Sequence, residues 1–252
     1  MSNILSNKTV LITGASKGIG EAAAYYLAEL GACVVLFARS EITLQKMSAK
    51  IPNSHFFVGD VSNSENVKQA VQLAIEKTGR LDVLINNAGI IDPIAKIVDS
   101  NVEAWSKVID VNVKGVYYAL KYAIPYLLKN KGTVINISSG AARSALEGWS
   151  HYCSSKAAVF SLTQCAHKEY AEQGLRVIGL SPGTVATDMQ KTIKASGVNP
   201  VSQLDWQDHI PAAWVAQAIA YLCGPGGNDF LGQDFSLKSN EGREAVGLPL
   251  IK

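Results

Sequence analysis

A glycine-rich segment near the start of the chain constrains the fold more than any other feature. The β-branched apolar run 9–13 predicts a short buried strand, which leads through the glycine-rich segment 14–20 into an alanine-rich helix over about 21–30. A glycine turn between a strand and a helix lets the backbone approach a phosphate, and the helix N-terminus offers free N–H groups. This order predicts a nucleotide-binding unit. The alternative is a glycine turn that only packs close to a sheet.

Apolar runs and helical patterns alternate along the rest of the chain. Further strands are expected at 32–37, 54–58, 81–85, 134–138, 174–180 and about 233–237, and helices from about 64, at 102–128, at 152–172 and at 212–221. Such alternation predicts a parallel sheet with helices on both faces. Because the 252 residues contain no internal repeat and no second-domain linker, we expect one domain over 1–252. Its fold is expected to be α/β and Rossmann-like, a doubly wound parallel seven-stranded sheet.

Net charge and cysteine content limit the kinds of molecule and metal that this chain is expected to bind. The net charge of +2 gives no reason to expect a nucleic acid or an anionic membrane, and no apolar run approaches the roughly 20 residues of a membrane span. The four cysteines form no C-x-x-C pair and no metal-ligand spacing with the four histidines. We therefore expect reduced thiols and no metal site. Since the chain starts without a signal-peptide pattern, we expect a cytoplasmic protein.

The end of the second strand predicts which dinucleotide is bound. An acidic residue at this position suits the free ribose 2′-hydroxyl of NAD, whereas an arginine suits a 2′-phosphate. The chain has Arg39 and Ser40 here, and Lys17 with Ser16 in the glycine turn is expected near the same ribose. Because the arginine fork matches phosphate well, these residues predict NADP(H). The alternative is that they are solvated loop residues.

Polar side chains follow several other strands. Asp60 could accept a hydrogen bond from the adenine amino group or cap the next helix, and the segment 86–89 (Asn-Asn-Ala-Gly) could line a ribose or form an Asx-type turn. After the sixth strand, the backbone of Val185 and the hydroxyl of Thr187 are suitably placed to hold a carboxamide.

Tyr152 and Lys156 carry the predicted chemistry. On a helix, side chains four residues apart have Cβ atoms roughly 5–6 Å from each other. A neighbouring ammonium lowers the pKa of a phenol from its ordinary value of about 10, so that the pair could act as a general acid or base near neutral pH. Ser139 follows the strand 134–138 and could lie beside them. The alternative is an incidental pair on a surface helix.

Asn112 and three loops complete the candidate site. Gly115, in the middle of the predicted helix 102–128, is unfavourable by about 1 kcal/mol relative to Ala, and it suggests a kink or close packing beside Asn112. Asn112 is either hydrogen-bonded core or the anchor of a water next to Lys156. The substrate is expected to meet the loops 90–96, 141–149 and 185–210, the last of mixed polarity and weak periodicity, as in a lid. Leu146, Trp149, Met189 and Trp206 suggest an apolar or aromatic ligand, although each is also an ordinary core candidate.

Taken in order, these residues resemble the classical short-chain dehydrogenases/reductases over nearly the whole chain. The resemblance is carried by Thr13, Gly14, Gly18, Gly20, Asp60, Asn86, Asn87, Ala88, Gly89, Asn112, Ser139, Tyr152, Lys156, Pro182 and Gly183. It implies that Tyr152 donates the proton, that Ser139 polarises the carbonyl, and that Lys156 lowers the tyrosine pKa and holds the ribose. It also implies that Asn112 holds a proton-relay water and that basic residues at 17 and 39 accompany NADP.

Two further segments indicate which subgroup of this family the chain resembles. The segments 182–190 and 205–209 look similar to sepiapterin reductases and their carbonyl-reductase relatives. The segment 230–235 departs from the glycine-ending form common in bacterial ketoacyl reductases, which argues against a role in fatty-acid synthesis.

The expected activity is the reversible, NADPH-dependent reduction of a ketone or aldehyde to an alcohol. The alternatives are an NAD-dependent alcohol or sugar dehydrogenase and a non-catalytic NADP(H)-binding regulator. The candidate cofactor-binding residues are Gly14, Ser16, Lys17, Gly18, Ile19, Gly20, Arg39, Ser40, Asp60, Val61, Asn87, Ala88, Gly89, Tyr152, Lys156, Pro182, Gly183, Val185 and Thr187. Because the helices 102–128 and 152–172 have apolar faces that could pair, and the resembling family is usually oligomeric, we expect a homodimer or homotetramer.

Overall fold

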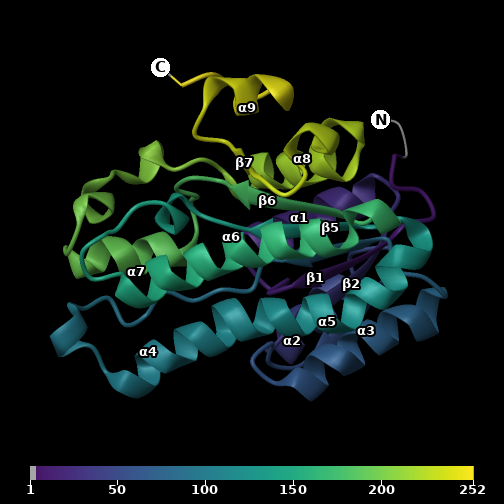
Figure 1. Ribbon diagram of the computed structural model, residues 1–252, viewed down its shortest axis with the longest axis horizontal. Helices are drawn as coiled ribbons and strands as arrows, with labels where there is room; N and C mark the ends of the chain where they lie inside the picture. Colours follow the sequence, from purple (N-terminus) through teal and green to yellow (C-terminus); the bar gives the residue numbers. More distant parts are fainter. Residues whose placement is uncertain (1–3, 252) are drawn as a thin grey trace.

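Seven short apolar runs form one parallel sheet in the computed structural model, which describes residues 4–251 (Figure 1). The strands are β1 (Thr9–Thr13), β2 (Cys33–Ala38), β3 (Ser54–Val58), β4 (Val83–Asn86), β5 (Thr133–Ile137), β6 (Arg176–Ser181) and β7 (Asp234–Ser236). Their order is β3-β2-β1-β4-β5-β6-β7, and every neighbouring pair is parallel. The predicted doubly wound α/β fold is confirmed. The order reverses between β1 and β4, where the carboxyl ends of parallel strands open a ligand crevice.

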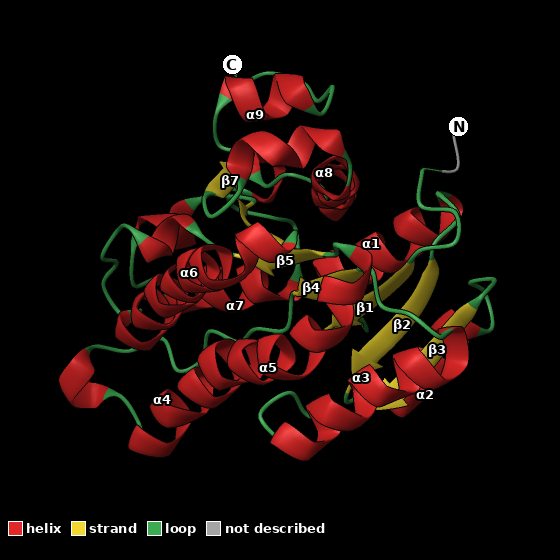
Figure 2. Ribbon diagram, turned by 45° about the vertical axis from the view of Figure 1, so that its right-hand side comes forward, coloured by secondary structure: helices red, strands yellow, loops and turns green. Residues whose placement is uncertain are grey.

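Helices cover both faces of the sheet (Figure 2). They are α1 (Gly18–Glu29), α2 (Glu41–Ser48), α3 (Ser64–Thr78), α4 (Val102–Ile109), α5 (Gly115–Leu127), α6 (Ser150–Tyr170), α7 (Asp188–Ser196), α8 (Ala212–Cys223) and α9 (Asn240–Ala245). Alternate residues of a strand point to opposite faces: Val10 and Ile12 join a core cluster with α1 and α8, whereas Leu11 joins one with α3 and α5. Within residues 4–251, no helix combines the length and apolar character that crossing a bilayer requires.

The helix expected at 102–128 is interrupted near its middle. A wider π-helical turn over Asp110–Lys114 separates α4 from α5. A Cβ on Gly115 would lie 3.1 Å from Val61 Cγ2 and 3.3 Å from the Val61 carbonyl oxygen. The expectation of close packing beside Asn112 is therefore confirmed, and it explains why the residue that opens α5 lacks a side chain.

The segment after β6 is more regular than its sequence pattern suggested. It contains α7, on which Ile193 is only 1% exposed, and a short parallel bridge between Val185 and Ile210. The sequence analysis missed this helix, because two turns present too few buried positions to show a period, and the lid role expected for 185–210 stays a prediction. The short helices α2 and α9 were missed for the same reason.

A buried chain of amides fastens α6 to the sheet. Asn86 Nδ2 donates to Asn136 Oδ1 at 2.8 Å, and Asn136 Nδ2 donates to Thr163 Oγ1 at 2.9 Å. All three side chains are at most 4% exposed. The first asparagine of the segment 86–89 is thus structural and does not line a ribose. By joining β4, β5 and α6, the chain fixes the helix that carries Tyr152.

We expect Asn136→Ala to lower the free energy of unfolding by about 2–4 kcal/mol. The substitution opens a small cavity and leaves the buried Asn86 amide without its acceptor, a loss of about 1–3 kcal/mol by itself. Urea denaturation monitored by circular dichroism measures the change. Asn130→Ala, which removes a single bond to the Leu81 carbonyl oxygen from a half-buried side chain, is the control and should cost less than about 1.5 kcal/mol. Equal losses in the two variants would contradict the assignment.

Candidate active site

The glycine turn leaves room that any larger residue would fill. Gly14 and Gly18 have φ of +65° and +59°, in the left-handed region. A Cβ on Gly14 would lie 2.8 Å from Ala88 Cα, and one on Gly20 would overlap the Gly14 carbonyl oxygen. No side chain among residues 4–251 caps the N-terminus of α1. The turn therefore presents backbone N–H groups and a positive dipole end, as a phosphate site requires.

Asn87 braces this turn. Its Nδ2 donates to the carbonyl oxygens of Thr13 and Gly14, both at 3.0 Å. Thr13 Oγ1 in return accepts from the backbone N–H groups of Asn87 and Ala88 at 3.0 and 3.1 Å. The ends of β1 and β4 are thereby held at a set separation. The side-chain nitrogen of Asn87 is thus already hydrogen-bonded within the protein. The predicted contact of Asn87 with a cofactor stays a prediction, and the side-chain oxygen is the atom left to make it. The bracing role of Thr13 was missed, since its partners are more than 70 residues away.

Two cations lie at the carboxyl edge of β1 and β2. Arg39 is exposed and forms no ion pair within residues 4–251. Lys17 Nζ lies 3.6 Å from Asp188 Oδ2, with both side chains exposed, so the pair contributes little stability. Ser40 Oγ is 2.8 Å from Thr43 Oγ1. The arrangement leaves two positive charges and a hydroxyl available to an anion.

Asp60 bonds to its own loop. Its Oδ1 accepts from the backbone N–H and the hydroxyl of Ser62 at 2.9 and 2.7 Å, and Lys107 Nζ lies 3.4 Å from its Oδ2. Partial burial acts to raise the pKa of Asp60, but these donors outweigh it and lower the pKa. The alternative that Asp60 caps the next helix was wrong, because Asn63 caps α3. Val61 is 7% exposed and packs on Gly115, which leaves mainly its backbone for the predicted cofactor contact.

The structure brings Ser139, Tyr152 and Lys156 together at the end of β5. Tyr152 and Lys156 are 8% and 6% exposed, and Lys156 Nζ lies 5.6 Å from the centre of the tyrosine ring. The ammonium donates a 2.7 Å hydrogen bond to the Ile137 carbonyl oxygen. The Ser139 side chain lies beside the Tyr152 hydroxyl, and its Oγ accepts from the Ala141 N–H at 3.2 Å.

The expected direction of the tyrosine pKa shift was wrong. Burial raises the pKa of Tyr152 to about 12, with the Ser139 hydrogen bond acting in the opposite direction. Burial also lowers the pKa of Lys156 to about 8, opposed by the charge of Asp234. Removing both groups from water disfavours the charged form of each. The ammonium is directed at the Ile137 carbonyl oxygen, so its attraction does not offset that desolvation.

Asn112 is buried, and its side chain is hydrogen-bonded within the protein. It is 1% exposed, and its Oδ1 accepts from the Ile90 N–H at 2.9 Å. Its Nδ2 donates to the Ile90 carbonyl oxygen at 2.9 Å and to Ser155 Oγ at 3.0 Å. Ser155 Oγ in turn donates to the Tyr152 carbonyl oxygen. Asn112 thus ties the loop after β4 to α6, and its predicted role in anchoring a water stays a prediction.

An apolar cluster surrounds Tyr152. Its buried members are Ile91, Ala141, Trp149, Tyr152 and Ile193, with Ile94, Leu146, Cys153, Met189 and Val201 packed around them. All three expected substrate loops contribute. Three of the four candidate substrate residues belong to this cluster, whereas Trp206 is 49% exposed and packs on His209 outside it. The contact of Trp206 with a substrate stays a prediction.

The loop after β6 approaches the glycine turn from the other side. Ala186 N donates to the Ile210 carbonyl oxygen and Ile210 N to that of Thr184, at 2.9 and 3.0 Å. The N–H and C=O of Val185, between them, have no partner among the described residues. A Cβ on Gly18 would lie 3.1 Å from Thr187 Cγ2, so Thr187 reaches the turn. Pro182 and Gly183, with φ of +81° at Gly183, provide the bend.

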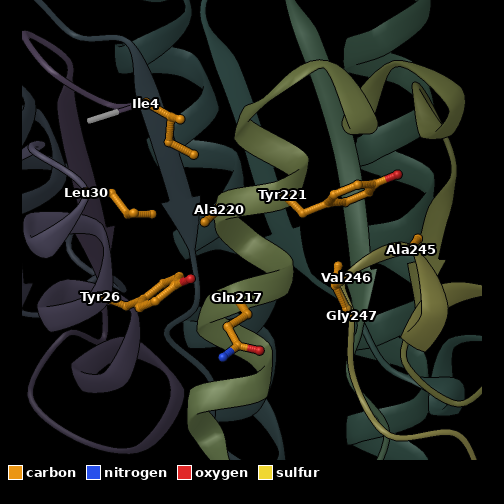
Figure 3. A pocket seen from close by; sticks show the side chains of 9 residues that line it. All are labelled: Ile4, Tyr26, Leu30, Gln217, Ala220, Tyr221, Ala245, Val246 and Gly247. Atoms are coloured by element: carbon orange, nitrogen blue, oxygen red, sulfur yellow. The ribbon is translucent and has the colours of Figure 1, made fainter. Parts of the chain in front are cut away.

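A separate groove of about 530 Å³ lies between α1, α8 and α9 (Figure 3). It is lined by Ile4, Tyr26, Leu30, Gln217, Ala220, Tyr221, Ala245, Val246 and Gly247. The lining carries no carboxylate, histidine, lysine or arginine, whereas the edge described above carries Ser139, Tyr152 and Lys156 beside the glycine turn. We therefore assign the candidate active site to the carboxyl edge of the sheet.

Comparisons with known proteins agree with this geometry. A family model described as short chain dehydrogenase matches residues 8–197. An uncharacterized oxidoreductase of Schizosaccharomyces pombe is 39% identical over 190 residues, which are 75% of each chain. An NADPH-dependent pterin aldehyde reductase of Arabidopsis thaliana is 38% identical over 192 residues, 75% of this chain and 79% of that one. The crystal structure of a short chain dehydrogenase/reductase from Saccharomyces cerevisiae matches with a TM-score of 0.86 and 29% identity, over 96% of this chain and 100% of that one.

Proposed function

The chain belongs to the short chain dehydrogenase family of oxidoreductases, and we propose that it reduces a ketone or aldehyde to an alcohol with NADPH. The observation that carries the proposal is the grouping of Ser139, Tyr152 and Lys156 at the sheet edge that also holds the glycine turn. The reaction is reversible, since the same groups can take a proton back from an alcohol.

The residues of the crevice fit a dinucleotide phosphate. The glycine turn, which a Cβ would fill, would hold the pyrophosphate at the N-terminus of α1. Arg39 and Lys17 would bind the 2′-phosphate, and the free backbone of Val185 with Thr187 would hold the carboxamide. When bound, NADPH supplies the hydride. The named activity of the Arabidopsis relative supports NADPH as the cofactor.

The protein groups then supply orientation and a proton. The hydroxyls of Ser139 and Tyr152 hold the carbonyl oxygen of the substrate, and Tyr152 donates its proton to that oxygen. A pKa of about 12 keeps the phenol protonated at neutral pH, as a donor must be. The ammonium of Lys156 stabilises the phenolate left behind, an interaction that strengthens as the charge develops.

The cluster around Tyr152 bears on the substrate class. Its members, including Trp149 and Leu146, offer an apolar surface to the part of the substrate next to the carbonyl group. We propose an apolar or aromatic carbonyl compound, and the pterin aldehyde activity named for the Arabidopsis relative is consistent with a planar one. A cytoplasmic location and a homodimeric or homotetrameric state stay predictions.

The test of the proposal is NADPH oxidation with a panel of aromatic and aliphatic ketones and aldehydes, followed at 340 nm. Turnover with at least one compound supports it. Tight NADPH binding without turnover would favour the non-catalytic regulator, and a preference for NADH would favour the NAD-dependent dehydrogenase.

We expect the rate of reduction at saturating NADPH to be flat below about pH 7 and to fall with a midpoint near pH 8. The pKa of Lys156 is lowered to about 8, so the ammonium is lost in that range, while Tyr152 with a pKa of about 12 stays protonated. Initial rates between pH 6 and 10 measure the profile.

Loss of the fold does not explain such a fall. The unfolded chain has the ordinary lysine pKa of 10.5 and binds more protons than the folded chain between about pH 8 and 10.5, so this group adds stability as the pH rises through that window. Thermal unfolding at pH 7 and pH 9.5 is the control. A rate that stays constant to pH 10 would contradict the role of the ammonium.

A further inference from the structure

Asp234 is a buried carboxyl that the proposed reaction leaves unexplained. It is the first residue of β7, and its side chain is 3% exposed. The opposite residue in β6 is Gly179, where a Cβ would overlap Asp234 Oδ1. A buried carboxyl is costly unless charges and hydrogen bonds compensate it, so its partners indicate what it does.

Those partners are the two ends of one loop. Asp234 Oδ2 accepts a 2.9 Å hydrogen bond from Ser138 Oγ, and Arg143 Nη2 lies 3.7 Å from the same oxygen. Ser138 precedes and Arg143 follows the 3₁₀ turn Gly140–Ala142, whose N-cap is Ser139. The guanidinium of Arg143 also lies 4.3 Å above the ring of Phe160 on α6. One carboxyl therefore contacts both ends of the segment 138–143, and Arg143 packs that segment on α6, the helix that carries Tyr152.

The carboxyl also faces the lysine of the site. Burial raises the pKa of Asp234, opposed by Ser138, Arg143 and the charge of Lys156. Asp234 Oδ1 is buried and has no hydrogen-bond partner among residues 4–251, which leaves its charge uncompensated at that atom. Lys156 donates to the carbonyl oxygen of Ile137, and Asp234 accepts from the hydroxyl of Ser138, the next residue. The ammonium and the carboxyl therefore bind adjacent residues at the end of β5.

We propose that Asp234 is a positioning residue for carbonyl reduction: by holding Ser138 and Arg143 it keeps the Ser139 hydroxyl aligned with Tyr152. The inference rests on the proposed function. Misplacement of a substrate-holding group by a fraction of an ångström affects the transition state more than the bound substrate, so the loss should fall on kcat.

Three single variants and one double variant test the role. Ser138→Ala should lower kcat about tenfold, and Asp234→Ala about 30-fold, with less than a twofold change in the dissociation constant of NADPH. Asp234→Asn keeps an acceptor for Ser138 and should retain at least a third of the wild-type kcat. The double variant Ser138→Ala/Asp234→Ala should be no slower than Asp234→Ala alone, because both substitutions break the same contact. Where Asp234→Ala does not fold, Ser138→Ala and Asp234→Asn decide the question.

Thr133→Val is the matched control. Thr133 lies at the opposite end of β5, is 4% exposed, and its Oγ1 accepts a 3.0 Å hydrogen bond from Arg176. The Thr133→Val variant should lower the melting temperature about as much as Ser138→Ala does, while leaving kcat unchanged. Wild-type kcat in Ser138→Ala, a kcat in Asp234→Asn as low as in Asp234→Ala, or losses that multiply in the double variant would overturn the positioning role alone. A wild-type protein that reduces no carbonyl compound would overturn the proposed function and, with it, this inference.

Discussion

Tyr152→Phe is expected to lower the rate of carbonyl reduction by about 10³-fold, within the 10²–10⁴-fold that a general acid contributes. The substitution removes one oxygen atom, which is both the proton donor and a hydrogen-bond donor to the carbonyl oxygen. The ring should stay in place, because it packs edge-to-face on Trp149 with the ring centres 5.5 Å apart. Steady-state NADPH oxidation measures the loss, and fluorescence titration should show an NADPH affinity within about twofold of the wild type.

Tyr122→Phe is the matched control for this change. It removes a tyrosine hydroxyl on α5 that lies 2.8 Å from Ser64 Oγ, outside the candidate site. We expect full activity from it and a small loss of stability. If Tyr152→Phe were as active as Tyr122→Phe, the phenol could not be the proton donor and the mechanism would be wrong.

Arg39→Asp is expected to reverse the cofactor preference. The ratio of kcat/KM with NADPH to that with NADH should fall by about 10³-fold, since a charge-assisted bond contributes about 1.5–3 kcal/mol and a like charge facing the 2′-phosphate costs a further amount of similar size. Arg39 is exposed and forms no ion pair with the rest of the described chain, so the substitution should not disturb the fold. The introduced carboxylate can instead accept from the ribose hydroxyls of NADH.

Lys50→Asp separates this local effect from a change in net charge. Lys50 is exposed just after α2, and its replacement by Asp changes the net charge by the same amount as Arg39→Asp does. Its kcat/KM ratio should equal that of the wild type at 150 mM salt. An unchanged ratio in Arg39→Asp would show that the 2′-phosphate is not bound at the end of β2, whatever the outcome for Tyr152→Phe.

The larger elements could be read from the sequence because their patterns are local. A buried parallel strand is a short β-branched apolar run, and each of the seven predicted runs lies within two residues of an observed strand. The glycines of the turn were identifiable because a left-handed φ and backbone contact at the Cβ position exclude other residues there. The pairing of Tyr152 with Lys156 followed from helical spacing alone.

The remaining properties of the site could not be predicted from local patterns, because they depend on burial and on contacts between residues far apart in the sequence. The direction of the Tyr152 pKa shift is one example, because desolvation depends on what covers the ring and not on the residue four positions along. The role of Asp234 is another: it bonds to Ser138, 96 residues earlier, and fits only because Gly179 lies opposite it. Local sequence patterns were enough to predict the fold and the side chains that reach the carboxyl edge of the sheet, since strand and helix periods are short-range. Packing determined their charge states and hydrogen bonds, since these depend on every element that removes them from water.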